Sequence, residues 1–140
     1  MKETALRQIA AWCGGTVDPR WAEVTVTGLC HDTRELQPGA LFFALTGTHD
    51  GHDYVSSAQE AGAAAAVVEH PVDSELPQVV TEDSRKALRD IAAAYKKTLS
   101  CKTVAITGSV GKTTTRTMAA ALLERSYRTY STVGNYNNDI

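Results

Sequence analysis

The 140-residue chain lacks several features that assign a protein to a specialised class. Its three cysteines, Cys13, Cys30 and Cys101, include no C-x-x-C pair, so neither a zinc knuckle nor a disulfide framework is indicated. Its four histidines show no metal-ligand spacing beyond the pair His49 and His52. A metal site made of protein ligands alone is therefore not expected, whereas magnesium that arrives with a phosphate ligand is compatible with the sequence.

A strong charge of one sign and a long apolar run are also missing. Lys and Arg number 14 against 16 Asp and Glu, which lacks the basic excess of a domain that binds nucleic acid through its phosphates. The longest apolar run, residues 63–68, is far below the roughly 18 residues that span a bilayer, and residues 1–3 lead into no signal-peptide core. We expect a cytoplasmic protein that neither binds nucleic acid nor inserts into a membrane.

What remains is the composition of an ordinary globular protein, with 43% hydrophobic and 21% charged residues. Hydrophobic periodicity predicts alternating helices and strands, and therefore an α/β fold. Helices are expected at residues 4–12, 53–61 and 84–97, and a further one after the loop at 108–113, running to about residue 126. Strands are expected at residues 24–30, 41–45, 64–69, 78–81, 103–107 and 129–132.

Charge and element order divide the chain near residue 100. Residues 1–100 carry a net charge of −5, and residues 101–140 carry +3. We predict one small, complete α/β domain at 1–100, followed at 101–140 by the first strand, glycine-rich loop, helix and strand of a second domain that is cut off. A parallel sheet needs helices on both faces, so residues 101–140 are not expected to bury themselves fully.

The sharpest chemical signal is the segment T-G-S-V-G-K-T-T-T at residues 107–115, between a predicted strand and a predicted helix. Gly108 and Gly111 permit a tight turn whose amides point at phosphate oxygens, and the helix N-terminus adds partial positive charge. Lys112 is placed to reach the β- and γ-phosphates, and Thr113 to ligate Mg²⁺. The usual phosphate-loop pattern has a further glycine where this chain has Ile106. The alternative is a structural glycine turn with an incidental lysine.

Three other polar segments allow two readings each. Residues 134–139, G-N-Y-N-N-D, form either an ordinary turn or a place where Asn135 or Asn138 approaches the γ-phosphate or its metal. Arg34, in D-T-R, either binds a diphosphate or pairs with its neighbouring aspartate on the surface. In the loop at 46–53, His52 or Asp53 either serves a ligand or caps the next helix.

Taken together, D-T-R, Q-P-G-x-L-F-F-A-L-x-G, D-G-H-D-Y, T-G-S-V-G-K-T-T-T and G-N-Y-N-N-D resemble the Mur ligases of peptidoglycan synthesis, in order and over essentially the whole chain. Within that family, D-G-H-D-Y and G-N-x-N-N-D are most similar to the member that adds D-Ala-D-Ala to UDP-MurNAc-tripeptide. The resemblance implies an N-terminal domain for the UDP end of the substrate, a central ATPase domain and a C-terminal domain.

The resemblance also implies roles for individual residues. Thr33 and Arg34 would face the UDP moiety, with Thr48 and His49 near the uracil. The ATP phosphates and Mg²⁺ would be held by six residues of the glycine loop and the helix start: Gly108, Ser109, Gly111, Lys112, Thr113 and Thr114. Asn135 and Asn138 would lie close by.

The implied activity is an ATP-dependent amide ligation through an acyl phosphate, by a full-length enzyme that is a monomer in the cytoplasm and serves cell-wall synthesis, cell shape and cell division. Residues 1–140 alone are expected to lack this activity. Two alternatives stay open: the tripeptide-forming ligase that acts on UDP-MurNAc-dipeptide, and a noncatalytic module that binds UDP-sugars.

Overall fold

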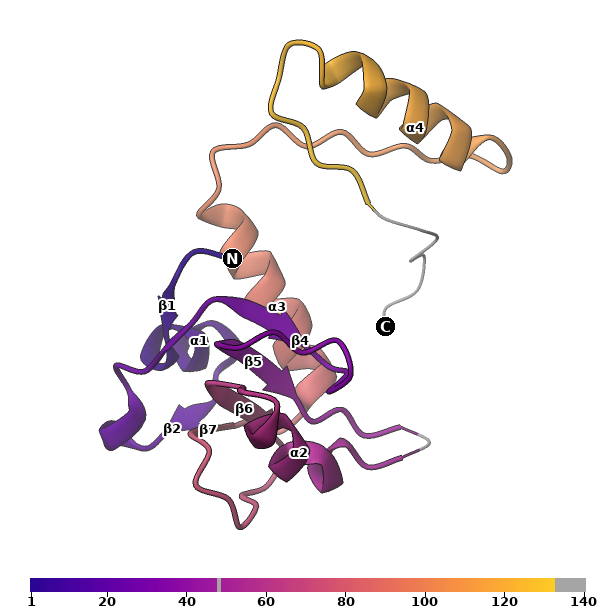
Figure 1. Ribbon diagram of the computed structural model, residues 1–140. Coiled ribbons are helices and arrows are strands. Elements are labelled where there is room, and N and C mark those ends of the chain that lie inside the picture. The colour runs from indigo at the N-terminus through magenta and orange to yellow at the C-terminus, as the bar shows by residue number, and fades with distance from the viewer. Residues whose placement is uncertain (48, 133–140) are drawn as a thin grey trace. The chain divides into compact units, whose positions relative to one another are not determined.

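The computed structural model describes residues 1–47 and 49–132, which belong to two units, Met1–Leu99 and Ser100–Ile140 (Figure 1). Unit 1 is built on a five-stranded sheet in the order β2-β7-β6-β5-β4. The four strands from β7 to β4 are parallel, and β2 pairs antiparallel with β7 at one edge. The bounds are β2 Thr16–Val17, β4 Gly28–Cys30, β5 Ala40–Phe43, β6 Ala65–Val68 and β7 Gln78–Val80.

Helices cover both faces of this sheet, because its central strands are apolar on both sides. On one face, Leu41 and Phe43 of β5 pack with α1, Leu6–Cys13, and α3, Ser84–Lys97. On the other face, Phe42 packs with α2, Val55–Glu60. The strand's alternating side chains thus join two hydrophobic clusters into a three-layer α/β unit.

The predicted helices of unit 1 are confirmed, with shifted ends. α3 has the predicted bounds, and the Asp83 side chain caps it by accepting from the Lys86 amide at 2.8 Å. α1 begins two residues later than predicted, because Thr4 and Ala5 form strand β1, Thr4–Ala5, with β3, Thr25–Val26. It ends at Cys13, one residue later than predicted, and Gly14 caps it with φ of +67°.

Several short elements were missed or merged. The predicted strand at 24–30 is two strands, β3 and β4, which belong to different sheets. β2 and the 3₁₀ turn η1, Pro19–Trp21, follow α1, and a second 3₁₀ turn, η2, Gly51–Tyr54, precedes α2. The two-residue strands β1 and β2 are too short to show a period, and the 3₁₀ turns η1 and η2 have no apolar run like those that marked β5 and β6.

Unit 2 contains α4, Lys112–Leu123, which confirms the predicted helix and ends it about three residues early. The strands predicted at 103–107 and 129–132 are wrong: neither segment is a strand. A strand needs a neighbouring backbone to bond, and no paired strand in the described part of unit 2 supplies one. No helix among residues 1–47 and 49–132 combines the length and apolarity needed to cross a membrane.

Candidate functional site

The polar loops of unit 1 gather at the carboxyl edge of its parallel strands. Because β4, β5, β6 and β7 run the same way, the segments that follow them leave the sheet at one edge. Open α/β sheets bind their ligands in the crevice outside this edge. The loops in question contain residues 31–34, 46–52, 69–70 and 81–85. This edge is therefore the first candidate site, and it includes the D-T-R and D-G-H-D-Y segments.

After β4, Arg34 forms a forked ion pair with Asp32. The Arg34 Nε lies 2.9 and 3.1 Å from the two carboxylate oxygens, and Nη2 lies 2.5 Å from Oδ2. These side-chain bonds, with the Arg34 backbone N–H, hold the pKa of Asp32 at about 2. The surface pair foreseen as one reading of Arg34 is thus present. Arg34 nevertheless keeps 86% of its side chain exposed, so its guanidinium is also accessible to an anion.

After β5, the chain makes a narrow turn. Thr46 and Asp50 form an isolated antiparallel bridge, and the Gly47 amide donates to the His49 carbonyl at 3.2 Å. The turn returns so closely to β5 that a Cβ on Gly51 would lie 2.5 Å from the Leu45 nitrogen, so a side chain is excluded there. His49 is exposed at this turn. Thr48, predicted to lie near it, falls outside the described residues.

His52 is buried and bonded at both ring nitrogens. Its Nε2 accepts the Glu69 backbone N–H at 2.9 Å, and its Nδ1 lies 2.6 Å from Asp50 Oδ1. The acceptor role of Nε2 requires that the neutral ring carry its proton on Nδ1. The His52 ring also stacks on His70, with centroids 4.1 Å apart. The cap of η2 is Asp50, which accepts the His52 amide at 3.0 Å, and not His52 or Asp53 as expected.

Glu69, which sequence analysis did not single out, ties these loops together. Its Oε1 accepts from the Ser84 amide at 3.0 Å and the Ser84 hydroxyl at 2.8 Å, and its Oε2 accepts from the Thr46 hydroxyl at 3.2 Å. The Ser84 amide is the main cause that lowers the pKa of Glu69 below its usual value. The available signal was its position, as the first charged residue after the apolar strand β6.

Unit 2 supplies the second candidate site, the glycine loop at the start of α4. Gly108 and Gly111 have φ of +152° and +78°, a region that favours glycine. α4 begins at Lys112, and its N-cap residue Gly111 has no side chain to occupy the helix N-terminus. Lys112 Nζ bonds the Gly108 carbonyl at 2.5 Å, so the lysine amine lies over the loop. Ser109, Thr113 and Thr114 are exposed beside it.

The remaining predicted residues have different outcomes. Asn135 and Asn138 lie outside the described residues. Thr33 is half-buried beside Arg34 at the carboxyl edge of unit 1. Across residues 1–47 and 49–132, the model has no group of three or more His, Cys, Asp or Glu placed to hold a metal ion.

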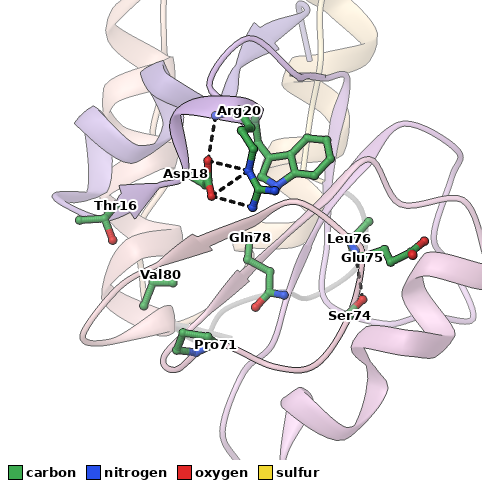
Figure 2. A pocket seen from close by; sticks show the side chains of 10 residues that line it. Thr16, Asp18, Arg20, Pro71, Ser74, Glu75, Leu76, Gln78 and Val80 are labelled. Carbon is green, nitrogen blue, oxygen red and sulfur yellow. Dashed lines mark hydrogen bonds and ion pairs between the residues drawn. The ribbon is translucent and has the colours of Figure 1, made fainter.

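A depression of about 670 Å³ lies elsewhere on unit 1, beside η1 and the β6–β7 loop (Figure 2). The Asp18–Arg20 ion pair stands on one side of it, with Nη2 and Oδ2 2.8 Å apart. Gln78 lies across from that pair, and its amide bonds both the N–H and the carbonyl of Val72. No predicted site residue lines this depression.

With both sites described, the chain can be compared with known proteins. The model of the Mur ligase family catalytic domain matches residues 25–106, and that of the Mur ligase middle domain matches residues 106–140. The chain therefore belongs to the Mur ligase family.

Its relatives include ligases named for the addition of 2,6-diaminopimelate, which match 70–74% of this chain, and ligases named for the addition of D-alanyl-D-alanine, several of which match 84% or more of it. The UDP-N-acetylmuramoyl-tripeptide–D-alanyl-D-alanine ligase of Escherichia coli is 42% identical over 120 residues, 85% of this chain and 26% of that protein. The crystal structure of MurF from Acinetobacter baumannii matches 99% of this chain and 31% of its own, with a TM-score of 0.90 and 32% identity. MurF from Thermotoga maritima in complex with ADP matches 80% and 26%, with a TM-score of 0.69 and 32% identity. The chain thus spans about a third or less of these relatives.

Proposed function

We propose that this chain is the N-terminal part of an ATP-dependent amide ligase that adds D-Ala-D-Ala to UDP-MurNAc-tripeptide. The observation that carries the proposal is the likeness, over nearly the whole chain, to ligases named for this reaction. Two candidate sites in separate units fit a reaction that needs both a nucleotide-sugar and a nucleoside triphosphate.

Unit 1 binds the UDP end of the substrate at the carboxyl edge of its sheet. Arg34 and Thr33 serve the diphosphate, because a guanidinium matches phosphate oxygens and stays charged at every relevant pH. Thr48 and His49 lie with the uracil in this proposal. The narrow turn that bears His49 supports that assignment, since it holds an exposed ring at the edge where α/β sheets take ligands.

Unit 2 holds the phosphates of ATP at the loop before α4. The positive-φ glycines and the helix N-terminus without a side-chain cap fit an anion, and Lys112 adds a mobile positive charge over the loop. Ser109 and Thr114 add polar groups beside the loop. The Thr113 hydroxyl is the proposed Mg²⁺ ligand, because hard cations take oxygen ligands and Mg²⁺ commonly binds through substrate phosphates. Asn135 and Asn138 complete the proposed set.

The chemistry asks mainly for positioning and neutralisation of charge. A carboxylate is a poor electrophile, and ATP with Mg²⁺, when bound, supplies the phosphoryl group that activates it as an acyl phosphate. Lys112 and the loop amides stabilise the negative charge that develops during this transfer. The dipeptide amine then attacks the acyl carbon, the carbon–oxygen bond to phosphate breaks, and the amide forms as inorganic phosphate leaves and the amine loses a proton. The proposal places the reaction in the cytoplasm, in a monomeric enzyme that serves peptidoglycan synthesis.

Calorimetric titration of the 140-residue chain with UDP-MurNAc-tripeptide, UDP and MgATP tests the proposal. We expect the two UDP ligands to bind, and we expect no phosphate release when D-Ala-D-Ala and MgATP are added. Binding of MgATP without any binding of UDP ligands would contradict the assignment of unit 1. In the complete enzyme, release of phosphate with UDP-MurNAc-dipeptide and a diamino acid, but not with D-Ala-D-Ala, would favour the tripeptide-forming ligase.

A further inference from the structure

Glu69 joins three parts of unit 1 that are distant in the sequence. Its carboxylate accepts from Thr46, 23 residues earlier, and from Ser84, 15 residues later. Its own backbone N–H donates to His52 Nε2. The turn between Thr46 and His52 is thus fastened at its first residue by the Glu69 side chain and at its last by the Glu69 backbone.

The same carboxylate also fastens the start of α3. Both Ser84 donors reach Oε1, and Ser84 is fully buried. A negative charge at a helix N-terminus is favourable, so Glu69 occupies the place that a phosphate would otherwise take there. Arg85, the next residue, donates from Nη2 to the Thr46 carbonyl at 3.1 Å. The helix start and the turn are therefore linked twice.

This arrangement argues against direct contact between Glu69 and a nucleotide. The carboxylate is committed to internal donors, and a negative group would repel a diphosphate. Its contribution to binding is the geometry that it imposes on others. Loss of the Glu69 carboxylate would remove one of the two links between the start of α3 and Thr46, the first residue of the turn that presents Gly47 and His49, and leave the link from Arg85.

We propose that Glu69 is the positioning residue of the nucleotide-binding turn: it holds the two ends of the turn, Thr46 and His52, against the start of α3, so that these ends are in place before UDP arrives. This inference rests on the proposed function, because it assigns the turn to the UDP end of the substrate. A preordered turn avoids the conformational entropy cost of ordering during binding.

Three variants of the 140-residue chain test the inference by titration with UDP. Glu69→Ala removes both acceptors and is expected to weaken UDP binding about tenfold. Glu69→Gln keeps an acceptor for Ser84 and places an amide N–H against the Thr46 hydroxyl, which can accept it, so most of the affinity should return. Glu60→Ala is the matched control, because it removes an exposed carboxylate at the end of α2.

Hydrogen exchange gives a readout that is independent of the ligand. In Glu69→Ala without UDP, the amides of Gly47 and Gly51 should exchange faster, while amides in the middle of α1 keep their rates. A global loss of stability would instead accelerate exchange both at the turn and in the middle of α1. If Glu69→Ala does not fold, Thr46→Val, which removes one exposed hydrogen bond, should still weaken UDP binding severalfold and accelerate exchange at the turn.

The outcomes separate this inference from the proposed function. If the wild-type chain binds UDP and Glu69→Ala binds it with the same affinity, the inference about Glu69 is overturned and the proposed function stands. Where Glu69→Ala does not fold, unchanged affinity in Thr46→Val has the same meaning. Equal losses in the Ala and Gln variants, with unchanged exchange at the turn, would overturn it as well. Failure of the wild-type chain to bind UDP would overturn the UDP assignment of unit 1, and this inference with it.

Discussion

The two units differ in what holds their candidate sites in place. Every buried hydrophobic residue among residues 1–47 and 49–132 belongs to unit 1, whose sheet and helices enclose two clusters. In the described part of unit 2, no residue is buried, and Met118, Leu122 and Tyr130 are exposed. The carboxyl-edge site depends on contacts between distant segments, such as Glu69 with Thr46. The glycine loop depends on local geometry, such as Lys112 with Gly108 four residues away.

This difference shows that the glycine loop is specified by a few consecutive residues, whereas the candidate site at the carboxyl edge of unit 1 needs a packed domain. Residues close in the sequence determine the backbone φ of Gly108 and Gly111 and the start of the helix. Because the two sites are built independently, we expect a substitution in one site to leave the other intact.

The largest expected effect is that of Lys112→Ala in the complete ligase. Removal of the amine takes away charge that stabilises the transferring phosphoryl group, so turnover should fall on the order of 100-fold or more. UDP binding by the 140-residue chain should not change, because unit 1 is built separately. Phosphate-release assays and UDP titration measure the two effects, with Lys102→Ala, another exposed lysine of unit 2, as the control. Turnover equal to that of the wild type would contradict the loop assignment.

The second effect concerns stability and compares one substitution in each unit. Ile91→Ala removes a fully buried side chain between α3 and the sheet, and should lower the free energy of unfolding by about 2–5 kcal/mol. Leu122→Ala removes a side chain that is 65% exposed in α4, and should change it by about 0.5 kcal/mol or less. Urea unfolding of the chain, followed by circular dichroism, measures both. Equal losses would mean that unit 2 has a core of its own.

Sequence reasoning predicted the helices and strands that are marked by a repeating apolar pattern or a continuous apolar run. α3 was predicted because apolar residues such as Ala87 and Ile91 repeat at helical spacing, and β6 because an apolar run fits a buried parallel strand. β2 failed because two residues have no period, and the strand at 103–107 failed because a strand depends on its partner as well as its own residues.

The candidate sites were predictable to the same extent. The glycine loop could be found because phosphate binding fixes the spacing of Gly108, Gly111 and Lys112. Glu69 was missed, because its position directly after an apolar strand is a weak signal that does not reveal its partners, and it meets Ser84 only when β6 brings the two together. For His52, the sequence left open a ligand contact or a helix cap, whereas in the structure its buried ring accepts a backbone N–H.

A smaller effect is expected from Arg34→Ala in the complete ligase. Loss of the guanidinium should raise the KM for UDP-MurNAc-tripeptide about tenfold, while the KM for ATP stays near normal. Arg20→Ala is a matched control, because Arg20 makes the same forked pair with Asp18 in another part of unit 1. The reverse pattern, a raised KM for ATP alone, would remove Arg34 from the UDP site.

The smallest expected effect is a shift in the titration midpoint of the Asp32 carboxyl. It shows whether Arg34 can bind both Asp32 and the diphosphate of UDP. The pKa of Asp32 is about 2 because Arg34 bonds its charged form. A lowered pKa means that the pair stabilises the folded state above about pH 4, the unfolded value, and that this contribution is lost as the pH falls towards 2. In Arg34→Ala, the midpoint should rise towards 3.8 but stay below it, since the backbone N–H of residue 34 still donates.

Carbon NMR of the Asp32 carboxyl group measures this midpoint, with Asp18, whose pKa is also lowered by an arginine, as the internal reference. Saturation with UDP gives the decisive comparison. If Arg34 turns to the diphosphate, Asp32 loses its side-chain donors and its midpoint should rise, while that of Asp18 stays unchanged. If Arg34 keeps the pair and binds UDP with its remaining N–H groups, both midpoints stay unchanged although UDP is bound. A raised midpoint at Asp18 alone would instead place the nucleotide at the depression beside η1, and not at the carboxyl edge.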